Sequence, residues 1–278
     1  LTNSNFQDAI ALWFDAEDNA TAIYGHISDW NTSAVTNMFQ TFKDRTDFNE
    51  YISGWDVSNV TNMQEMFNGA STFNQAIGDW DVSKVTNMGG VFYDALSFNQ
   101  PIGNWDLSSV TRTDYMFRNA QSFNQEIGDW NTSNVGNMTS MFQLSAAFDQ
   151  AIGNWKTSLV TSLANTFNGA ASFNQDLSDW NVSAVTNMGT MFENTTSLSS
   201  NNKGLIHEAF AYNSNWPYDW REFVSLDDTN FQTAVNLWFD NETEANATYG
   251  HISDWNVSAV TDMSEAFKNR TDFNEDIS

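Results

Sequence analysis

The 278-residue sequence contains no cysteine, which excludes disulfide bonds, thiol catalysis, cysteine-ligated zinc and cysteine-linked lipid anchors within this stretch. Basic residues are also scarce. Ten Lys and Arg stand against 35 Asp and Glu, and the formal net charge is −25 at pH 7. A chain this acidic repels nucleic-acid phosphates and anionic membrane surfaces, so we expect neither as a partner.

Long apolar runs and catalytic motifs are missing as well. The longest uninterrupted apolar run, Ala9–Phe14, is too short to insert into a membrane. No Gly-x-Ser-x-Gly elbow, phosphate loop or His-Glu-x-x-His is present, and the three histidines are scattered. We therefore predict that the protein is not an enzyme and has no catalytic residues or cofactor. Because no basic-then-apolar leader follows Leu1, we also expect a mature protein or a fragment.

The sequence does contain a strict internal repeat of 25 residues. One row of seven tryptophans keeps this spacing: Trp30, Trp55, Trp80, Trp105, Trp130, Trp155 and Trp180. Two rows of phenylalanines, which begin at Phe42 and Phe48, follow the same period. A fixed period of this length is typical of a solenoid, in which each unit buries its apolar face against its neighbours.

The sequence also repeats at a longer period of 225 residues, which is nine times 25. Asn5–Ser53 and Asn230–Ser278 align without a gap and share 34 of 49 residues. We therefore expect one whole module followed by the start of another, and a natural polypeptide that continues. The predicted parts are an N-terminal cap helix (1–22), a seven-repeat solenoid (23–197), a C-terminal cap and linker (198–229) and the start of a second, homologous module (230–278).

Each repeat predicts a short strand and a short helix. Trp80-Asp81-Val82 alternates apolar and polar residues, as a half-buried strand does, whereas Met88, Val91, Phe92 and Ala95 are spaced like one stripe of a helix. We therefore predict an α/β solenoid with one short parallel strand and one short helix per repeat, capped at both ends. The tryptophan row is predicted to be its core ladder; the alternative is an exposed aromatic strip that stacks on sugars.

The repeat resembles a known family. The string Trp55-Asp56-Val57-Ser58-Asn59-Val60-Thr61-Asn62-Met63, followed by Met66-Phe67 and Phe73-Asn74-Gln75, is similar to the BspA-type leucine-rich-repeat surface proteins of bacteria and mycoplasmas. The caps look like those of marine microbial members. This resemblance implies a leucine-rich-repeat-like solenoid, a secreted or cell-surface location, and adhesion or protein binding without enzyme activity. The sequence departs from the family pattern because Trp, Phe and Met replace most leucines.

Acidic residues flank the tryptophans. If Trp80 points inward, its two neighbours point outward, because side chains alternate along a strand. The candidate ligand or calcium face comprises Asp56, Asp79, Asp81, Asp106 and Asp129. Flexible oxygen coordination suits calcium to such a surface, although no known calcium-binding loop motif is present. The alternative is a solvated acidic face without a ligand.

Two functions of different classes remain open. The first is a structural or adhesive cell-surface component, with tandem modules that build a stalk, fibre or sheath and associate with themselves or with a surface protein. The second is a module that recognises a glycan or a protein through its acidic face, assisted by calcium. Both place the protein outside the cell.

Overall fold

The structure, a computed structural model, describes residues 1–271, 273–275 and 277. Of the predicted second module, residues 272, 276 and 278 lie outside the described residues. The chain divides into two compact units: residues 1–175 with 180–197, and residues 176–179 with 198–278. The boundaries predicted at 22/23 and 229/230 stay predictions.

Helices lie outside the repeats. The first unit contains α1 (Phe6–Asp15), α2 (Glu17–Tyr24) and the short 3₁₀ helix η1 (Ile27–Asp29). The second unit contains α3 (Ser200–Phe210), η2 (Arg221–Phe223), α4 (Phe231–Asp240), α5 (Glu242–Tyr249) and η3 (Ile252–Asp254). The elements α4, α5 and η3 recur 225 residues after α1, α2 and η1, as expected from the 225-residue sequence repeat.

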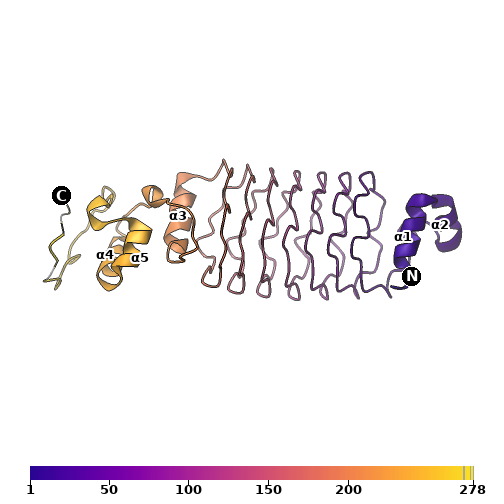
Figure 1. Ribbon diagram of the computed structural model, residues 1–278, viewed down its shortest axis with the longest axis horizontal. Coiled ribbons are helices and arrows are strands. Elements are labelled where there is room, and N and C mark those ends of the chain that lie inside the picture. The colour runs from indigo at the N-terminus through magenta and orange to yellow at the C-terminus, as the bar shows by residue number, and fades with distance from the viewer. Residues whose placement is uncertain (272, 276, 278) are drawn as a thin grey trace. The chain divides into compact units, whose positions relative to one another are not determined.

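In the first unit the 25-residue repeats form a stack of coils, one coil per repeat, with α1 and α2 at one end of the stack (Figure 1). Isolated parallel bridges join equivalent residues of successive coils, beginning with Asn37–Asn62 and Asn62–Asn87 and continuing to Ser162–Asn187. These bridges therefore pair equivalent residues of neighbouring coils.

The predicted leucine-rich-repeat-like α/β solenoid is wrong, because the described part of the chain contains no strand and, from Trp30 to the end of the last coil, no helix. In each coil the bridge lies seven residues after the tryptophan, for example at Asn62 after Trp55, and not at the predicted Trp-Asp-Val strand. Each bridge involves a single residue of a coil. The parallel pairing that the prediction placed at the tryptophans therefore occurs elsewhere and is too short to form a strand.

The predicted helix is replaced by two consecutive turns. The N–H groups of Glu65 and Phe67 donate to the carbonyl oxygens of Gly89 and Val91 in the next coil, at 2.9 Å each, instead of to carbonyls four residues back. Between these bonds, Met66 donates to the Met63 carbonyl. Two tight turns of four residues place apolar side chains at the same spacings as a helix, so the sequence pattern alone does not distinguish them.

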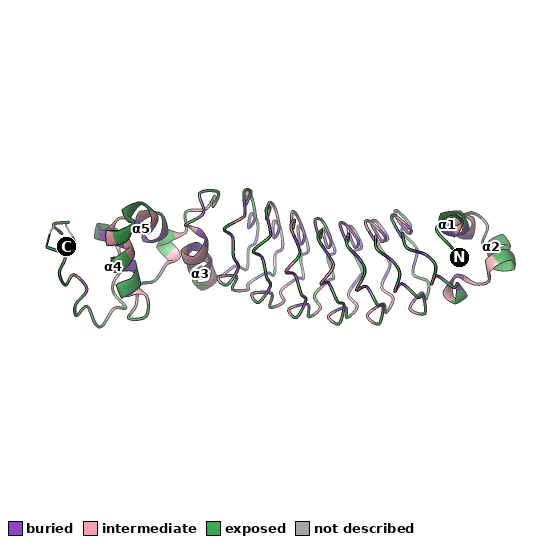
Figure 2. Cartoon of the chain, turned by 90° about the horizontal axis from the view of Figure 1, so that it is seen from below, coloured by how far each residue is buried: buried purple, intermediate pink, exposed green. Residues whose placement is uncertain are grey.

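Stacked aromatic rings fill the interior of the coils. Within a coil, Phe67 and Phe73 stack with ring centroids 3.9 Å apart. Between coils, Phe67 stacks on Phe92 at 5.7 Å and Phe73 on Phe98 at 6.0 Å. Buried and exposed residues alternate along each coil (Figure 2). A side chain placed once per coil thus meets its own copies above and below, which buries nearly all of its apolar surface.

Helix α1 covers the first coil. Phe6 meets Trp55 edge to face with ring centroids 5.7 Å apart, and Phe14 meets Phe48 at 5.8 Å. Asn3 Oδ1 accepts hydrogen bonds from the backbone N–H groups of Thr36 and Asn37, which have no earlier coil to bond to. The first helical segment thus protects the end of the stack, where its core and its unpaired backbone would otherwise meet water.

Candidate functional site

The tryptophan row lies inside the stack. Trp30, Trp55, Trp80, Trp105, Trp130, Trp155 and Trp180 are each at most 5% exposed. Five of the seven indole Nε1 atoms donate to the carbonyl oxygen of an isoleucine in the coil before, for example Trp105 to Ile77 at 3.1 Å and Trp130 to Ile102 at 3.1 Å. These rings are thus unavailable as a strip for stacking sugars.

All five aspartates of the candidate ligand face are exposed, but the coil geometry divides them into two groups. Asp56, Asp81 and Asp106 follow a tryptophan and accept the backbone N–H of the serine two residues on, in one turn per coil. Asp79 and Asp129 precede a tryptophan and line two open depressions. The predicted single row of aspartates is therefore divided into turn residues, which follow a tryptophan, and residues of the depressions, which precede one.

Local hydrogen bonds hold the first group. The Ser58 hydroxyl and backbone N–H both donate to Asp56 Oδ1 and lower the pKa of that carboxyl, while the charge of Asp81 opposes this shift. Ser83 lowers the pKa of Asp81 in the same way. Each carboxylate thus stabilises the backbone turn that it begins, and this structural role repeats along the stack.

The depressions that contain Asp79 and Asp129 have volumes of about 650 and 390 Å³ and share Asn104 and Glu126. We call them together the acidic trough. A Cβ atom at Gly78 would lie 2.3 Å from the carbonyl oxygen of Pro101, so only glycine lets the next coil approach this closely. The trough is polar and open, and its carboxylates are exposed, whereas Gln125 and Gln150 donate hydrogen bonds to asparagines of the coil before.

A third hollow of about 460 Å³ lies on another part of the same coils. We call it the Gly89–Gly90 hollow, because glycines stand there where the coils before and after carry Gln64-Glu65 and Asp114-Tyr115. It also contains Lys43, Arg112 and Arg118, three of the ten basic residues of the chain. Sequence reasoning missed this site; the signal was the Gly-Gly pair together with basic residues at positions that are mostly Asn or Gln in other coils.

The carboxylates of the Gly89–Gly90 hollow are already paired. Glu65 accepts hydrogen bonds from Gln40 Nε2 and Lys43 Nζ; burial raises the pKa of Glu65, but these donors together hold it below its ordinary value. Arg112 grips Asp114 with two hydrogen bonds, Nε to Oδ1 at 3.0 Å and Nη2 to Oδ2 at 2.8 Å. These two parallel hydrogen bonds fix the Asp114 carboxylate in one position at the side of the hollow.

Metal ligation has no preformed centre in the part of the chain that the structure describes, since no three His, Asp or Glu side chains gather there. His26 does not face such a cluster either. Its Nδ1 lies 2.8 Å from Ser28 Oγ and accepts the Ser28 backbone N–H at the start of η1. Calcium on the acidic residues therefore stays a prediction.

Comparison with protein families identifies the repeat. A family model described as "Mycoplasma protein of unknown function, DUF285" matches residues 13–130, 117–215 and 206–278. The chain belongs to the DUF285 family. These three matches of the DUF285 model overlap, as expected when one repeat pattern fills a chain. No curated protein and no solved structure matches this DUF285 chain.

Among the residues that the structure describes, no helix of this DUF285 chain combines the length and apolar character needed to cross a bilayer.

Proposed function

We propose that this DUF285 chain is a non-enzymatic, extracellular repeat protein of the BspA surface type, and that tandem modules of it build a structural or adhesive stalk, fibre or sheath on a cell. The observation that carries this proposal is the uninterrupted ladder of backbone hydrogen bonds and stacked aromatic rings through the coils. Such a ladder resists bending and extends by adding coils, which suits a load-bearing surface element.

The segment between the modules also supports a stalk. In the second unit, the segment after the coils is packed against the helices that open the next module. His207 Nε2 of α3 lies 3.1 Å from the carbonyl oxygen of Ala247 in α5, and the Tyr249 hydroxyl donates to Glu208 Oε1 at 2.8 Å. Within the second unit, these contacts fix α3 to the helices that open the next module, so this segment is packed and is not a flexible linker.

Immunogold electron microscopy on intact cells of the source organism tests this proposal. Antibodies raised against residues 1–197 should label extended structures on the outside of unpermeabilised cells, and the same antibodies should block attachment of those cells. Labelling that requires permeabilisation would contradict the surface location. Surface labelling without any effect on attachment would leave the stalk as a structural element and remove the adhesive role.

A second candidate function is recognition of a basic protein segment or a glycan through the acidic trough, assisted by calcium. Its support is the two adjoining depressions that contain Asp79 and Asp129 beside Glu126. Carboxylates gathered at one surface attract cations and lysine-rich peptides within about one Debye length, roughly 8 Å at physiological salt.

Thermal unfolding with and without calcium tests the metal in this second function. If calcium bridges the trough, millimolar calcium should raise the unfolding midpoint of the wild-type chain, and the rise should vanish in the double variant Asp79→Asn/Asp129→Asn. The matched control is Asp56→Asn/Asp106→Asn, outside the trough, which should keep the calcium response. An unchanged midpoint in wild type would end the calcium hypothesis.

A further inference from the structure

The Gly89–Gly90 hollow differs from every surface that the repeat itself builds. Its floor is formed where two glycines interrupt the side chains between Glu65 of the coil before and Asp114 of the coil after. A Cβ atom at Gly90 would lie 3.2 Å from Glu65 Cγ, and one at Gly89 would lie 3.5 Å from Asp114 Oδ1. A side chain at either position would contact these neighbours, so the opening exists because both residues are glycine.

The charge of the hollow is opposite to that of the protein. Lys43 and Arg112 each form a salt bridge with a carboxylate of the hollow, whereas Arg118 forms none with any carboxylate among the described residues. With three basic and two acidic side chains, the hollow is formally +1 in a chain of net charge −25. An unpaired guanidinium at such a place is suited to one anionic group.

Arg118 is held in position for a ligand. Its Nη1 donates to the Tyr93 hydroxyl at 2.7 Å, and its guanidinium carbon lies 4.8 Å from the centroid of the Tyr93 ring. In the described part of the chain, Nη2 of Arg118 has no hydrogen-bond acceptor. A guanidinium fixed by an aromatic ring and one hydrogen bond loses little conformational freedom when it binds an anion.

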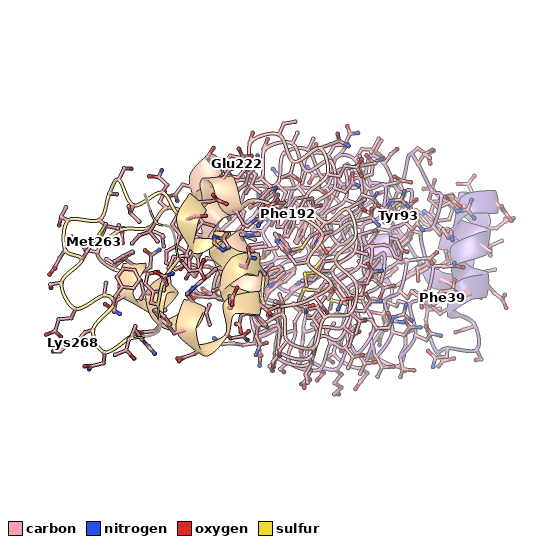
Figure 3. The ribbon with its side chains drawn as sticks, turned by 60° about the vertical axis from the view of Figure 1, so that its left-hand side comes forward. Phe39, Tyr93, Phe192, Glu222, Met263 and Lys268 are labelled. Atoms are coloured by element: carbon pink, nitrogen blue, oxygen red, sulfur yellow. The ribbon has the colours of Figure 1, made fainter. Side chains whose placement is uncertain are left out.

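Two aromatic rings and two amides complete the lining. Tyr93, labelled in Figure 3, and Tyr115 have ring centroids 6.5 Å apart at an interplanar angle of 30°. Tyr115 is 39% exposed, so its ring face is open to a ligand. Gln64 and Asn68 also line the hollow. Gln64 Oε1 already accepts a hydrogen bond from Asn87 and Asn68 Nδ2 donates one to Glu65, so Gln64 Nε2 and Asn68 Oδ1 are the atoms that can bind hydroxyl groups. Apolar ring faces bordered by hydrogen-bonding groups match a sugar, which has a C–H face and a rim of hydroxyls.

We propose that the Gly89–Gly90 hollow binds a saccharide unit with a single carboxylate, such as a uronic or sialic acid. Nη2 of Arg118 binds the carboxylate, Tyr115 stacks on the C–H face of the sugar, and Gln64 and Asn68 bind its hydroxyls. The unit carries one charge, because a polyanion would meet the strong negative field of the rest of the chain. This site goes beyond the proposed surface function and does not depend on where in the organism the protein resides.

Isothermal titration of the 278-residue chain with defined methyl glycosides tests the proposal. The probes are the methyl glycosides of glucuronic acid and N-acetylneuraminic acid, with methyl glucoside as the neutral comparison. We expect one or both acids to bind at one site per chain and methyl glucoside to bind at least about tenfold more weakly, the effect of one charged hydrogen bond. Raising the salt concentration should weaken the acid selectively.

Two pairs of matched variants locate the site. Gly89→Phe fills the hollow, and the equivalent position in the first coil is naturally Phe39, so the coil accepts this side chain. Gly189→Phe adds the same ring at the equivalent position of a coil outside the hollow, where a Cβ atom meets the same neighbour, an asparagine Oδ1 at 3.3 Å. Arg118→Gln removes the proposed anion ligand, and Lys156→Gln removes one positive charge elsewhere.

We expect Gly89→Phe and Arg118→Gln to weaken acid binding at least about tenfold, and the two controls to leave it within about twofold. Circular dichroism checks that each variant is folded. Failure of both acids to bind, equal binding of the neutral glycoside, or equal loss in Gly189→Phe would each overturn the proposal. So would tighter binding of a short peptide through its terminal carboxylate, which would make the hollow a peptide site.

Discussion

Among the core tryptophans, Trp80 is the one whose indole nitrogen has no hydrogen-bond partner within the described part of the chain. Trp55, Trp105 and Trp130 each donate to the carbonyl oxygen of an isoleucine in the coil before. Trp80 Nε1 is buried and has no such partner. A buried donor without an acceptor loses its bond to water and gains none in return, so this indole contributes less to stability than its copies.

A pair of tryptophan-to-phenylalanine substitutions measures that difference. Trp130→Phe removes both ring volume and the hydrogen bond to Ile102, whereas Trp80→Phe removes the same volume and no bond. We expect Trp130→Phe to lower the free energy of unfolding by about 1 kcal/mol more than Trp80→Phe does. Urea unfolding followed by far-ultraviolet circular dichroism gives both values. Equal losses would mean that the indole bonds contribute nothing net.

The buried ring of His207 in the second unit makes hydrogen bonds that depend on its protonation state. It is 2% exposed, its Nδ1 accepts a hydrogen bond from Trp216 Nε1 at 2.8 Å, and its Nε2 donates to the Ala247 carbonyl. This arrangement requires the neutral ring. Burial lowers the pKa of His207 below its ordinary value of 6.5. Because the folded state therefore binds fewer protons, the stabilisation is complete above pH 6.5 and is lost as pH falls.

Hydrogen exchange should show this pH dependence. We expect backbone amides of α3 and α5 to lose protection between pH 7.5 and pH 5, after correction for the intrinsic exchange rate, because protonation displaces the Trp216 donor. Amides of the coils serve as the internal reference. The variant His207→Gln should be less protected at pH 7.5 and should show little further change. A wild-type profile as flat as that of His207→Gln would refute the role of the histidine.

At the scale of the element, each coil depends on left-handed backbone at two positions. Non-glycine residues adopt it repeatedly, with φ of 54° at Glu65, 60° at Tyr115 and 61° at Leu144. Left-handed backbone is costly for most side chains, by roughly 1–2 kcal/mol, and asparagine tolerates it best after glycine. The carbonyl of the next coil keeps these residues in place, since Leu144 donates to Asn168 at 2.8 Å.

Substituting Leu144 by asparagine should relieve this strain. Leu144 is 43% exposed, and the equivalent position is Asn119 in the coil before. We expect Leu144→Asn to raise the free energy of unfolding by up to about 1 kcal/mol. The control is Leu159→Asn, which removes a leucine that is 54% exposed and not left-handed, and should give no gain. Denaturant midpoints of the two variants measure this gain. A gain in both would mean that replacing an exposed leucine by a polar side chain is sufficient, without any relief of backbone strain.

At the scale of the whole molecule, the contacts that recur from coil to coil join residues a fixed number of positions apart. The backbone bonds join residues 24, 25 or 26 apart, such as Phe67 to Val91, Thr86 to Thr61 and Thr72 to Thr46, and the indole bonds between coils join residues 28 apart. The stack in the first unit therefore depends on the period and not on any one coil. Contacts of this kind make stability approximately a sum over neighbouring coils.

Deleting one coil tests this dependence on period. Removal of residues 131–155 joins Trp130 to Lys156 and keeps every later residue in phase. We expect this variant to retain a cooperative melting transition within about 10 °C of wild type. Removal of residues 132–155, one residue fewer, puts every later side chain out of phase and should abolish the transition or lower it much further. Similar melting curves for the two deletions would show that the coils do not depend on phase.

The sequence by itself determined the period and the rows of buried rings. Identical spacing brings identical side chains together, so a row such as Trp105, Trp130 and Trp155 follows from counting alone. The outward position of Asp56 and Asp81 also followed, because each is next to a buried tryptophan. These properties depend only on neighbours along the chain and on repetition.

Only the tertiary structure decided the conformation of each coil and the place of the Gly89–Gly90 hollow. Apolar spacing is the same for a helix and for two successive tight turns, and the carbonyls of the next coil, 24 residues away, favour the turns. The hollow likewise joins side chains of several coils, such as Lys43, Glu65 and Arg118, which only stacking brings to one surface. Both depend on backbone and side chains distant in sequence, so local patterns do not reveal them.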